Sequence, residues 1–234
     1  MKLVFDIETV GQDWDSIDEL TRADLTRWLK KENLSNDDLE FKVNNIKDET
    51  ALSPLTGEVV SIAIYDIERS AGAVYFQAPE SEKAIFFEED GIKYQSMTER
   101  EILETFWKIA QKYNEFITFN GRGFDAPFLA IRSAINGIPP SVDLMEGRYT
   151  YQQKGVKHTD IYDQMTFYGA MSKKGSLHLF CRAFGIPSPK EGTKGSEVSE
   201  MFKDKEYEKI ARYNIGDVLA TKELYEKWAG FLKF

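Results

Sequence analysis

The chain has 234 residues, of which 42% are hydrophobic, and its formal net charge is −9 at pH 7. This length allows one large α/β domain or two small ones, and the apolar content can fill a sizeable core. No apolar run is long enough to span a membrane, and Asp6 follows the N-terminus too closely for a signal peptide. We therefore expect a cytoplasmic protein without a membrane partner. The negative charge argues against a surface that binds nucleic-acid phosphates over its whole extent.

The cysteine and histidine content limits the metal chemistry of this sequence. The single cysteine, Cys181, excludes an intrachain disulfide and agrees with a reducing compartment. One cysteine and two histidines disfavour a zinc site of nitrogen and sulfur ligands. A metal in this protein would have oxygen ligands, which favours magnesium or manganese.

One segment departs from the acidic balance of the chain. Residues 121–195 hold 10 basic and 6 acidic side chains, a local charge of +4, whereas the other 20 basic and 33 acidic side chains give −13. A basic stretch of this kind could hold phosphates near a metal site. A solvated surface with a chance asymmetry explains the same counts.

Predicted strands and helices alternate along the chain. In chain order they are a strand at 1–10, a helix at about 16–31, strands at 58–65 and 72–78, a helix at 96–113, a strand at 115–119, a helix at 126–136, a strand at 157–163, and helices near 174–184 and 205–229. This order predicts an α/β fold with a five-stranded mixed sheet flanked by helices.

The segment after the first strand is an insertion in this pattern. Residues 11–57 hold the first helix and a polar stretch, and no repeat, low-complexity tract or linker divides the sequence. We therefore predict a single domain over residues 1–234. Ser16 with Glu19, and Ser96 with Glu99, fit the capping-box pattern at the starts of the first two helices.

The sequence FDIET at residues 5–9 places two acidic residues in a strand that otherwise has the composition of a protein core. Side chains alternate between the faces of a strand, so Asp6 and Glu8 share one face. Their Cα atoms are about 6 to 7 Å apart, which allows one cation to contact both carboxylates. Without a cation, each buried carboxylate would cost on the order of several kcal/mol. The alternative is an edge strand whose acidic face is in contact with water.

Two further acidic residues lie in FNGRGFDAPFL and YNIGD. Asp125 comes just after the fourth strand, and the alternative to a functional role is an N-cap with Pro127 in the first helical turn. Asp217 lies in the last helix, one turn after Tyr213 and on the same face. Gly216 beside it suggests that the backbone packs closely on something, or else that the helix bends or frays there.

Together, FDIET, FNGRGFDAPFL and YNIGD resemble, in this order, the three motifs of the DEDD superfamily of 3′-to-5′ exonucleases, which has a ribonuclease H-like fold. The resemblance covers most of the chain. It is closest to the proofreading exonuclease domain of family-B DNA polymerases and to the stand-alone predicted exonucleases related to it. Tyr213 matches the tyrosine branch, because Arg212 stands where the other branch has a histidine. Residues 11–57 are a departure from this resemblance.

The resemblance implies a metal-dependent 3′-to-5′ exonuclease that releases nucleoside monophosphates from DNA with two Mg²⁺ or Mn²⁺ ions. Asp6, Glu8 and Asp217 would bind one ion, Asp6 would bridge to the second, and Asp125 would support the second through water. Two such cations about 4 Å apart can stabilise the attacking and leaving oxygens of an in-line displacement at phosphorus. The attacking group is then a water molecule.

The resemblance also implies roles for residues beside the metals. The ordinary pKa of a tyrosine is about 10, so Tyr213 is expected to orient the attacking water and not to act as a base. Asn120, Phe124 and Thr9 match positions that contact the terminal nucleotide, and Phe124 could stack on a base. A core position is the alternative for Phe124.

Other residues and other functions remain as alternatives. Asp160 and Asp163 are expected to lie outside the metal shell, and His158 is the next candidate to assist the water if Tyr213 does not. The expected partner is single-stranded DNA or a 3′ end of DNA, with a polymerase or repair protein as a further partner. An exoribonuclease is the first alternative, because the chemistry does not use the 2′ position. A nucleic-acid-binding module without activity is the second. A sugar kinase or ATPase on the same fold lacks support, because we see no Gly-rich phosphate loop.

Overall fold

The computed structural model describes residues 1–31, 35–79, 81, 83–173, 175–188 and 197–233. Across these residues the strands form one sheet in the order β4-β5-β3-β2-β1-β6-β7. The strands are β1 (Lys2–Gly11), β2 (Gly57–Asp66), β3 (Ala71–Phe76), β4 (Phe86–Glu89), β5 (Ile92–Ser96), β6 (Glu115–Thr118) and β7 (Lys157–Asp160). Because β1 is antiparallel to β2 and parallel to β6, the sheet is mixed, as the sequence predicts.

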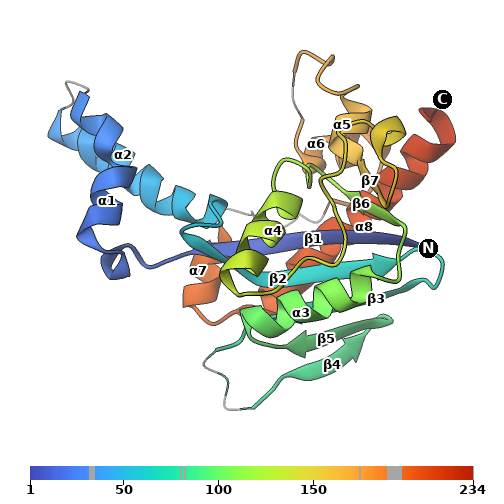
Figure 1. Cartoon of the computed structure of the whole chain (residues 1–234), viewed down its shortest axis with the longest axis horizontal. Helices are drawn as coiled ribbons and strands as arrows, with labels where there is room; N and C mark the ends of the chain where they lie inside the picture. The colour runs from blue at the N-terminus through green and yellow to red at the C-terminus, as the bar shows by residue number, and fades with distance from the viewer. Residues whose placement is uncertain (32–34, 80, 82, 174, 189–196, 234) are drawn as a thin grey trace.

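Helices cover both faces of this sheet (Figure 1). The helices outside the insertion are α3 (Glu99–Ala110), α4 (Asp125–Ile135), α5 (Ile161–Met165), α6 (Leu177–Phe184), α7 (Val198–Lys203) and α8 (Tyr207–Phe231). Helices α3 and α4 pack on one face of β2, while α8 packs against β1, β2 and β3, and α6 packs on α8. This arrangement confirms the predicted α/β, ribonuclease H-like class.

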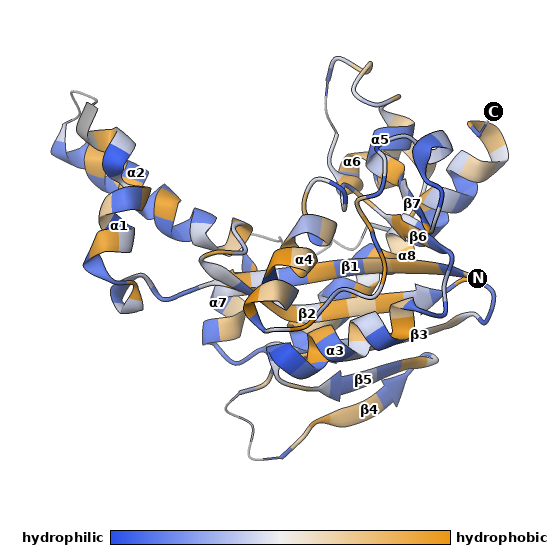
Figure 2. Ribbon diagram, viewed as in Figure 1, coloured by the Kyte–Doolittle hydropathy of each residue, from blue (hydrophilic) through white to orange (hydrophobic). Residues whose placement is uncertain are grey.

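The two faces of β1 contribute side chains to two different hydrophobic clusters. Leu3, Phe5 and Ile7 belong to the cluster that includes residues of α3 and α4, whereas Val4 belongs to the cluster that includes residues of α8. Figure 2 shows β1 and β2 as largely hydrophobic strands. The acidic residues that share the face of Val4 therefore project toward α8.

The predicted number of strands, five, is wrong: in the described part of the chain the sheet has seven. The two missed strands, β4 and β5, form a hairpin in which Glu89 pairs with Ile92. The two residues between them, Asp90 and Gly91, have φ values of 50° and 75°. An Asp-Gly pair with left-handed φ at both positions is the typical two-residue hairpin turn. The Asp90-Gly91 pair in the sequence is therefore sufficient to predict a hairpin here.

The insertion after β1 is helical, but its details differ from the prediction. Its first helix is α1 (Glu19–Leu25), followed by a short 3₁₀ segment, η2 (Arg27–Lys31). Asp18, and not Ser16, caps α1 by accepting the N–H of Thr21. The polar stretch that follows contains a second helix, α2 (Asn36–Glu49), capped by Ser35, and a 3₁₀ turn, η3 (Thr50–Leu52). Helices α1 and α2 project from the sheet as an arm (Figure 1).

The insertion begins and ends at adjacent positions of the sheet. Gly11, the last residue of β1, pairs with Gly57, the first residue of β2. A Cβ atom on Gly11 would lie 2.9 Å from the backbone nitrogen of Ala51, which is closer than side chains approach. Glycine is therefore needed where η3 crosses the end of β1. The interpretation of residues 1–234 as a single domain stays a prediction.

The start of α3 lies two residues beyond the predicted capping box. Thr98 caps this helix, and the reciprocal hydrogen bonds of the box are made with Glu101. Ser96 is instead the last residue of β5, where its hydroxyl accepts the N–H of Ile85 at 2.7 Å. Glu99 is consequently free of the capping role that the sequence pattern assigned to it.

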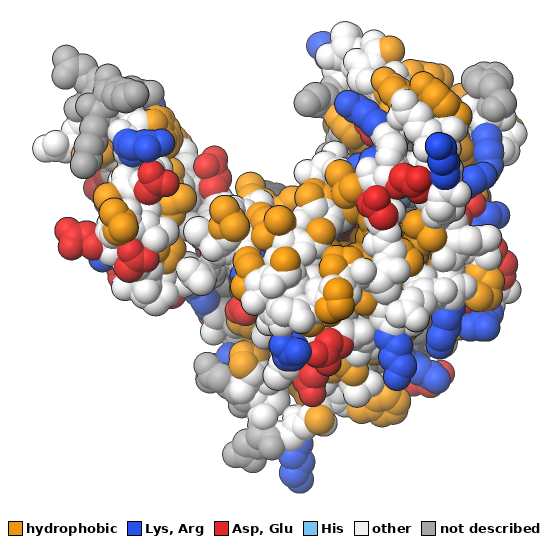
Figure 3. Space-filling model, in the orientation of Figure 1, with side chains coloured by type: hydrophobic (Ala, Val, Ile, Leu, Met, Phe, Trp, Pro, Cys, Tyr) orange, Lys and Arg blue, Asp and Glu red, His pale blue; other side chains and the backbone are white. Residues whose placement is uncertain are grey.

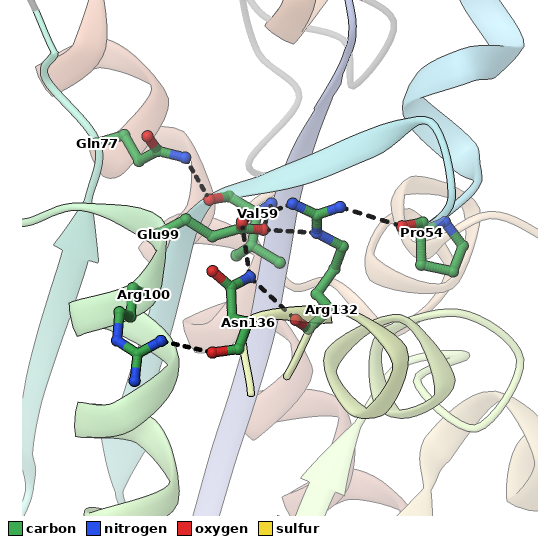
Figure 4. A network of polar contacts seen from close by, with 7 residues as sticks. All are labelled: Pro54, Val59, Gln77, Glu99, Arg100, Arg132 and Asn136. Carbon is green, nitrogen blue, oxygen red and sulfur yellow. Dashed lines mark hydrogen bonds and ion pairs between the residues drawn. The ribbon is translucent and has the colours of Figure 1, made fainter. Parts of the chain in front are cut away.

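The buried carboxylate of Glu99 forms an ion pair with the half-buried side chain of Arg132 that ties α3 to α4. Arg132 places Nη2 at 2.7 Å from Oε2 and Nε at 2.8 Å from Oε1 of this carboxylate (Figure 4). The carboxylate also accepts the N–H of Val59 at 2.8 Å and the amide of Asn136 at 3.1 Å. Arg132 further donates to the carbonyl of Pro54 at 3.3 Å. The network thus joins β2, α3 and α4 to the returning end of the insertion.

The remaining elements follow the prediction with shifted ends. The predicted strand at 157–163 ends at Asp160, where α5 begins, and the last helix extends from Tyr207 to Phe231. Helix α7 was not predicted. Within the described residues, none of the helices has the length and apolar character that a membrane span requires. Residues 174 and 189–195 of the basic stretch at 121–195 lie outside the described residues.

Candidate active site

The site is built where one edge of β1 loses its neighbouring strand. Strand β6 pairs only with Lys2–Val4 of β1. On this edge, the residues of β1 after Val4 have no strand partner. The N–H of Ile7 is satisfied there by Oδ1 of Asp125, at 3.1 Å. Figure 3 shows that the molecule is hollowed between the arm of α1 and α2 and the part that carries α5 and α6.

Three of the predicted acidic residues meet at this position. Asp6 and Glu8 come from β1, and Asp217 comes from α8, which packs across β1. Each offers a carboxylate oxygen, and these oxygens lie within 4.8 Å of one another. Glu8 and Asp217 are buried, and Asp6 is half-buried. A set of carboxylate oxygens at this spacing fits the coordination of Mg²⁺ or Mn²⁺.

Electrostatic repulsion makes it unfavourable for all of these carboxylates to be ionised at the same time. Burial raises the pKa of Asp6 well above its ordinary range, and the carboxylates of Asp125, Asp217 and Glu8 raise it further. A hydrogen bond from Asn214 acts in the opposite direction and lowers it. Such mutual repulsion among buried carboxylates is the electrostatic condition that a bound divalent cation relieves.

Asp125 is the first residue of α4, and it does not cap this helix. The preceding residue, Phe124, is at the N-cap position, and its side chain makes no capping hydrogen bond. The Asp125 carboxylate is buried and points to β1, where it accepts the N–H of Ile7. Burial raises its pKa from 3.8 to about 7, while its backbone hydrogen bonds lower it. The N-cap alternative for Asp125 is therefore wrong.

Tyr213 lies one turn before Asp217 on α8. Its hydroxyl donates a hydrogen bond to Asp217, and its ring is buried in the cluster that includes Val10 and Val60. Burial, together with the negative charges of Asp217, Glu8 and Asp6, raises the pKa of this hydroxyl. The phenol therefore stays protonated at neutral pH and can act as a hydrogen-bond donor or acceptor, but not as a base.

Asn214 is a site residue that the sequence did not reveal. Its Nδ2 donates to Oδ2 of Asp6 at 2.7 Å, and its Oδ1 accepts the hydroxyl of Ser61 at 2.8 Å. Asn214 is completely buried, so these two contacts fix its orientation. The only sequence signal for Asn214 is its position next to Tyr213. Its partners Ser61 and Asp6 lie 153 and 208 residues away in the chain.

A cleft of about 450 Å³ opens beside the carboxylates. Asp6 and Asp217 line it together with Asn120. The residues of the wall that were not predicted are Phe119, Tyr162, Gly175, Ser176 and Leu177. Most of them lie on the loop and short helices after β6 and β7, where no local pattern indicates a shared cavity.

Asn120 is held in this cleft by a strained loop. Its φ of 62° is left-handed, a conformation that asparagine adopts more readily than most residues. The carboxylate of Asp160 accepts the N–H of Asn120 at 2.8 Å and that of Arg122 at 2.9 Å. Asp160 also accepts the N–H of Tyr162, as the cap of α5. The structure thus gives Asp160 a positioning role outside the carboxylate cluster.

The other predicted substrate residues have contacts of their own. The hydroxyl of Thr9 donates to the carbonyl of Ala51 in η3 at 2.7 Å, so it is joined to the insertion. Phe124 is half-buried, with its ring 5.4 Å from that of Phe128. Neither residue lines the cleft described above. Their roles in substrate binding stay predictions.

His158 and Arg212 have partners outside the carboxylate cluster. The Nδ1 atom of His158 lies 2.8 Å from the carbonyl of Leu144, so Nδ1 carries the proton and Nε2 accepts from Thr118. Burial lowers the pKa of His158 to about 4. Arg212 pairs with Glu89 of β4 at 2.9 Å. His158 is thus fully committed within the core and is not available to assist a water.

A family model with the description "Predicted 3'-5' exonuclease related to the exonuclease domain of PolB" matches residues 70–231. The chain belongs to this family. The matched range includes the second and third motifs, with Asp125, Tyr213 and Asp217, and it begins after Asp6 and Glu8. The fold brings these two segments of the site together.

Archaeal DNA polymerases are similar to part of the chain. A DNA polymerase of Desulfurococcus sp. (strain Tok) is 29% identical over 139 residues, and one of Thermococcus gorgonarius is 27% identical over the same length. These alignments cover 54% of this chain and 18% of each polymerase. The chain therefore corresponds to a small part of these relatives.

A solved structure extends the likeness to nearly the whole fold. The family B DNA polymerase of Pyrobaculum calidifontis aligns with a TM-score of 0.61 and 20% identity. The alignment covers 99% of this chain and 25% of that polymerase. At this identity the likeness concerns the fold alone, which agrees with the ribonuclease H-like class.

Proposed function

We propose that this chain is a metal-dependent 3′-to-5′ exonuclease that releases nucleoside monophosphates from DNA. The observation that carries the proposal is the meeting of Asp6, Glu8 and Asp217, the first and third of which line an open cleft. Tyr213 is hydrogen-bonded to Asp217. Membership of a family of exonucleases related to polymerase proofreading domains supports it. The proposed substrate is single-stranded DNA or a 3′ end of DNA.

Four carboxylates are proposed as ligands of two ions. Asp6, Glu8 and Asp217 would hold the first Mg²⁺ or Mn²⁺, Asp6 would share the second, and Asp125 would support it through water. When bound, such ions stabilise negative charge on the attacking and leaving oxygens and acidify water. The carboxylate of Asp125 is already fixed toward β1 by the N–H of Ile7, so it needs little reorganisation.

Other residues act on the water and the substrate. The protonated hydroxyl of Tyr213 orients the attacking water in line with the bond that breaks. Asn120, which lines the cleft, and Phe124 and Thr9, which do not, are proposed to contact the terminal nucleotide. Asn214 holds the carboxylate of Asp6 in position and touches neither water nor substrate.

Two alternatives make different predictions for the same site. An exoribonuclease would use the same carboxylates and differ by a contact to the 2′-hydroxyl. An inactive binding module would bind nucleic acid without shortening it. A polymerase or repair protein as partner, and a cytoplasmic location, stay predictions.

The decisive experiment uses 5′-labelled DNA and RNA oligonucleotides with Mg²⁺, Mn²⁺ or chelator. We expect a ladder of DNA products that shorten from the 3′ end with metal and none with chelator. The control is Asp6→Asn, which removes one charge from the cluster at almost constant volume and should abolish the ladder. Shortening of RNA alone would favour the exoribonuclease. Full-length oligonucleotide after long incubation with protein that binds it would favour the inactive module.

A further inference from the structure

We propose that an aromatic platform beside α5 binds single-stranded DNA on the 5′ side of the nucleotide that occupies the cleft. The platform consists of Tyr149, Tyr151, Phe167 and Tyr168. This inference rests on the proposed function, since it assigns a second contact to the same substrate. The bases of that segment stack on the exposed rings, and nearby lysines bind its phosphates.

The tyrosines of the platform are arranged as a stack with an open face. The rings of Tyr149 and Tyr151 are nearly parallel, at 9°, with centroids 5.7 Å apart. Tyr168 packs edge-on against Tyr149 at 4.6 Å. Tyr151 is 81% exposed, so its outer face contributes little to a core. An exposed ring with a fixed orientation is what single-strand-binding proteins offer to a base.

The turn after α5 holds a further ring in solvent. Phe167 and Tyr168 have φ values of 50° and 56°, followed by Gly169 at 93°. A left-handed backbone is unfavourable for residues with bulky side chains. It is kept here by the N–H of Tyr168, which donates to the carbonyl of Asp163 at 2.7 Å. The turn leaves Phe167 55% exposed, so the strained conformation is not explained by burial of this ring.

A pocket with basic residues adjoins these rings. The pocket has a volume of about 300 Å³, and Phe167 and Tyr168 line it together with Lys157 and Lys233. Glu115, which also lines it, accepts the hydroxyl of a neighbouring threonine at 2.9 Å. Exposed lysines beside exposed aromatic rings complement a single strand, which offers alternating phosphates and bases.

The platform is close enough to the cleft for one strand to reach both. Tyr162 lines the cleft, and the next residue, Asp163, pairs with Arg148 at 3.0 Å beside the tyrosine stack. Lys157 at the pocket and Asp160 at the cleft loop are three residues apart on β7, or roughly 10 Å. A strand with its 3′ end in the cleft therefore needs to extend by only a few nucleotides to reach the platform.

Binding measured without catalysis tests this inference. Fluorescence anisotropy in chelator compares a 5′-labelled oligonucleotide of about three nucleotides, which fills the cleft, with one of about twelve, which reaches the platform. We expect Tyr151→Ala and Phe167→Ala each to weaken binding of the longer oligonucleotide by about tenfold and to leave the shorter one unchanged. Tyr151→Trp, which keeps a stacking ring, should retain wild-type affinity.

The matched control is Phe86→Ala on β4, which removes an apolar ring that is 65% exposed at the far edge of the sheet. It should bind both oligonucleotides as the wild type does. The platform is overturned if its variants bind the longer oligonucleotide like wild type, or if they weaken both lengths equally.

The failure of the proposed function has a different signature. Wild-type protein would then fail to shorten DNA with metal, whether or not it binds the oligonucleotides in chelator. If the wild type shortens DNA with metal while the platform variants bind normally, the exonuclease proposal stands and only the platform is wrong. Thermal melting of each variant, expected to be unchanged, separates loss of binding from loss of folding.

Discussion

The side-chain amide of Asn214 donates a hydrogen bond of 2.7 Å to Oδ2 of Asp6. Because Ser61 fixes the other end of the same amide, the orientation of the carboxylate depends on a residue of α8 and on one of β2. Residues that orient a metal ligand in this way typically change metal affinity by about 10- to 100-fold when removed.

We predict that Asn214→Ala lowers the affinity for Mg²⁺ by about tenfold or more, since Asp6 loses its fixed orientation. Calorimetric titration with metal measures this effect without substrate. Ser61→Ala is the control, because it removes only the more distant hydrogen bond and should have a smaller effect. Equal metal affinity in Asn214→Ala and wild type would show that Asp6 needs no such support.

The hydroxyl of Tyr213 is the subject of a second prediction. Tyr213→Phe keeps the buried ring and should lower kcat by about 10- to 1000-fold with little change in KM, because only the transition state loses a contact. Single-turnover rates on a short single-stranded DNA measure this directly. Tyr225→Phe on the same helix is the control, since its hydroxyl lies near Glu115 and away from the carboxylates. If Tyr213→Phe reacts at the wild-type rate, Tyr213 is a packing residue.

The carboxylate cluster should make metal-free protein less stable as the pH rises. An unfolded aspartate loses its proton near 3.8, whereas folded Asp125 keeps its proton up to about 7, and the pKa of Asp6 is raised as well. The stability that these protonated carboxyl groups give to the folded protein is therefore complete below the ordinary aspartate pKa. It is lost as the pH rises through their raised pKa values in the folded protein. We expect Mg²⁺ to raise Tm much more at pH 7.5 than at pH 5, as measured by melting with metal or chelator.

Asp125→Asn is the control for this effect, because it removes one titrating group. Its chelator curve should depend less on pH than that of the wild type. A Tm that is insensitive to millimolar Mg²⁺ at both pH values would argue against a preformed site.

His158 predicts a pH dependence of the opposite sign. Its pKa falls from 6.5 in the unfolded chain to about 4 in the folded protein, because burial disfavours the charged ring. Its contribution to stability is complete above 6.5 and is lost as the pH falls toward 4, by up to about 3 kcal/mol. We predict that His158→Gln, whatever its stability at pH 7, loses less stability than wild type between pH 7 and pH 5 in urea unfolding. Parallel curves for the two proteins would contradict the lowered pKa.

The ion pair of Glu99 and Arg132 leads to a prediction on stability alone. Arg132→Met removes the partner of a buried carboxylate and should destabilise the protein by about 3 to 5 kcal/mol. Its side chain is away from the cleft, so kcat per folded molecule should stay near wild type. The surface pair of Arg27 and Asp24 is the control, since Arg27→Met should cost at most about 1 kcal/mol. Urea unfolding of both variants measures the difference.

Local patterns in the sequence predicted the carboxylate site better than its surroundings. The alternation of a strand is enough to place Asp6 and Glu8 on one face, and helical spacing is enough to place Tyr213 beside Asp217. Asn214 could not be found in this way, because its hydrogen bonds join residues that are far apart in the chain. The same holds for Tyr162 and Ser176, whose shared cavity depends on how short helices pack.

Some errors had a local cause. The sequence from Ser96 to Glu101 contains two overlapping capping-box patterns, Ser96 with Glu99 and Thr98 with Glu101, and the helix uses the second. The choice is made by the sheet, because Ser96 is engaged with Ile85 as part of β5. The strand count was too low for a different reason, since the Asp-Gly turn at residues 90–91 lies between strands that are largely polar or exposed.

The pairing of Gly11 with Gly57 makes the whole insertion equivalent to the turn of one β-hairpin. The entropy of closing such a connection grows slowly with its length, by about 0.6 kcal/mol for each doubling. The register of β1 and β2 therefore depends little on which residues the connection contains. An exchange of residues 12–49 that keeps η3 would also keep the contacts of Ala51 with Thr9 and of Pro54 with Arg132. A different accessory segment can therefore replace this one, next to the carboxylates, without changing the order or the register of the strands.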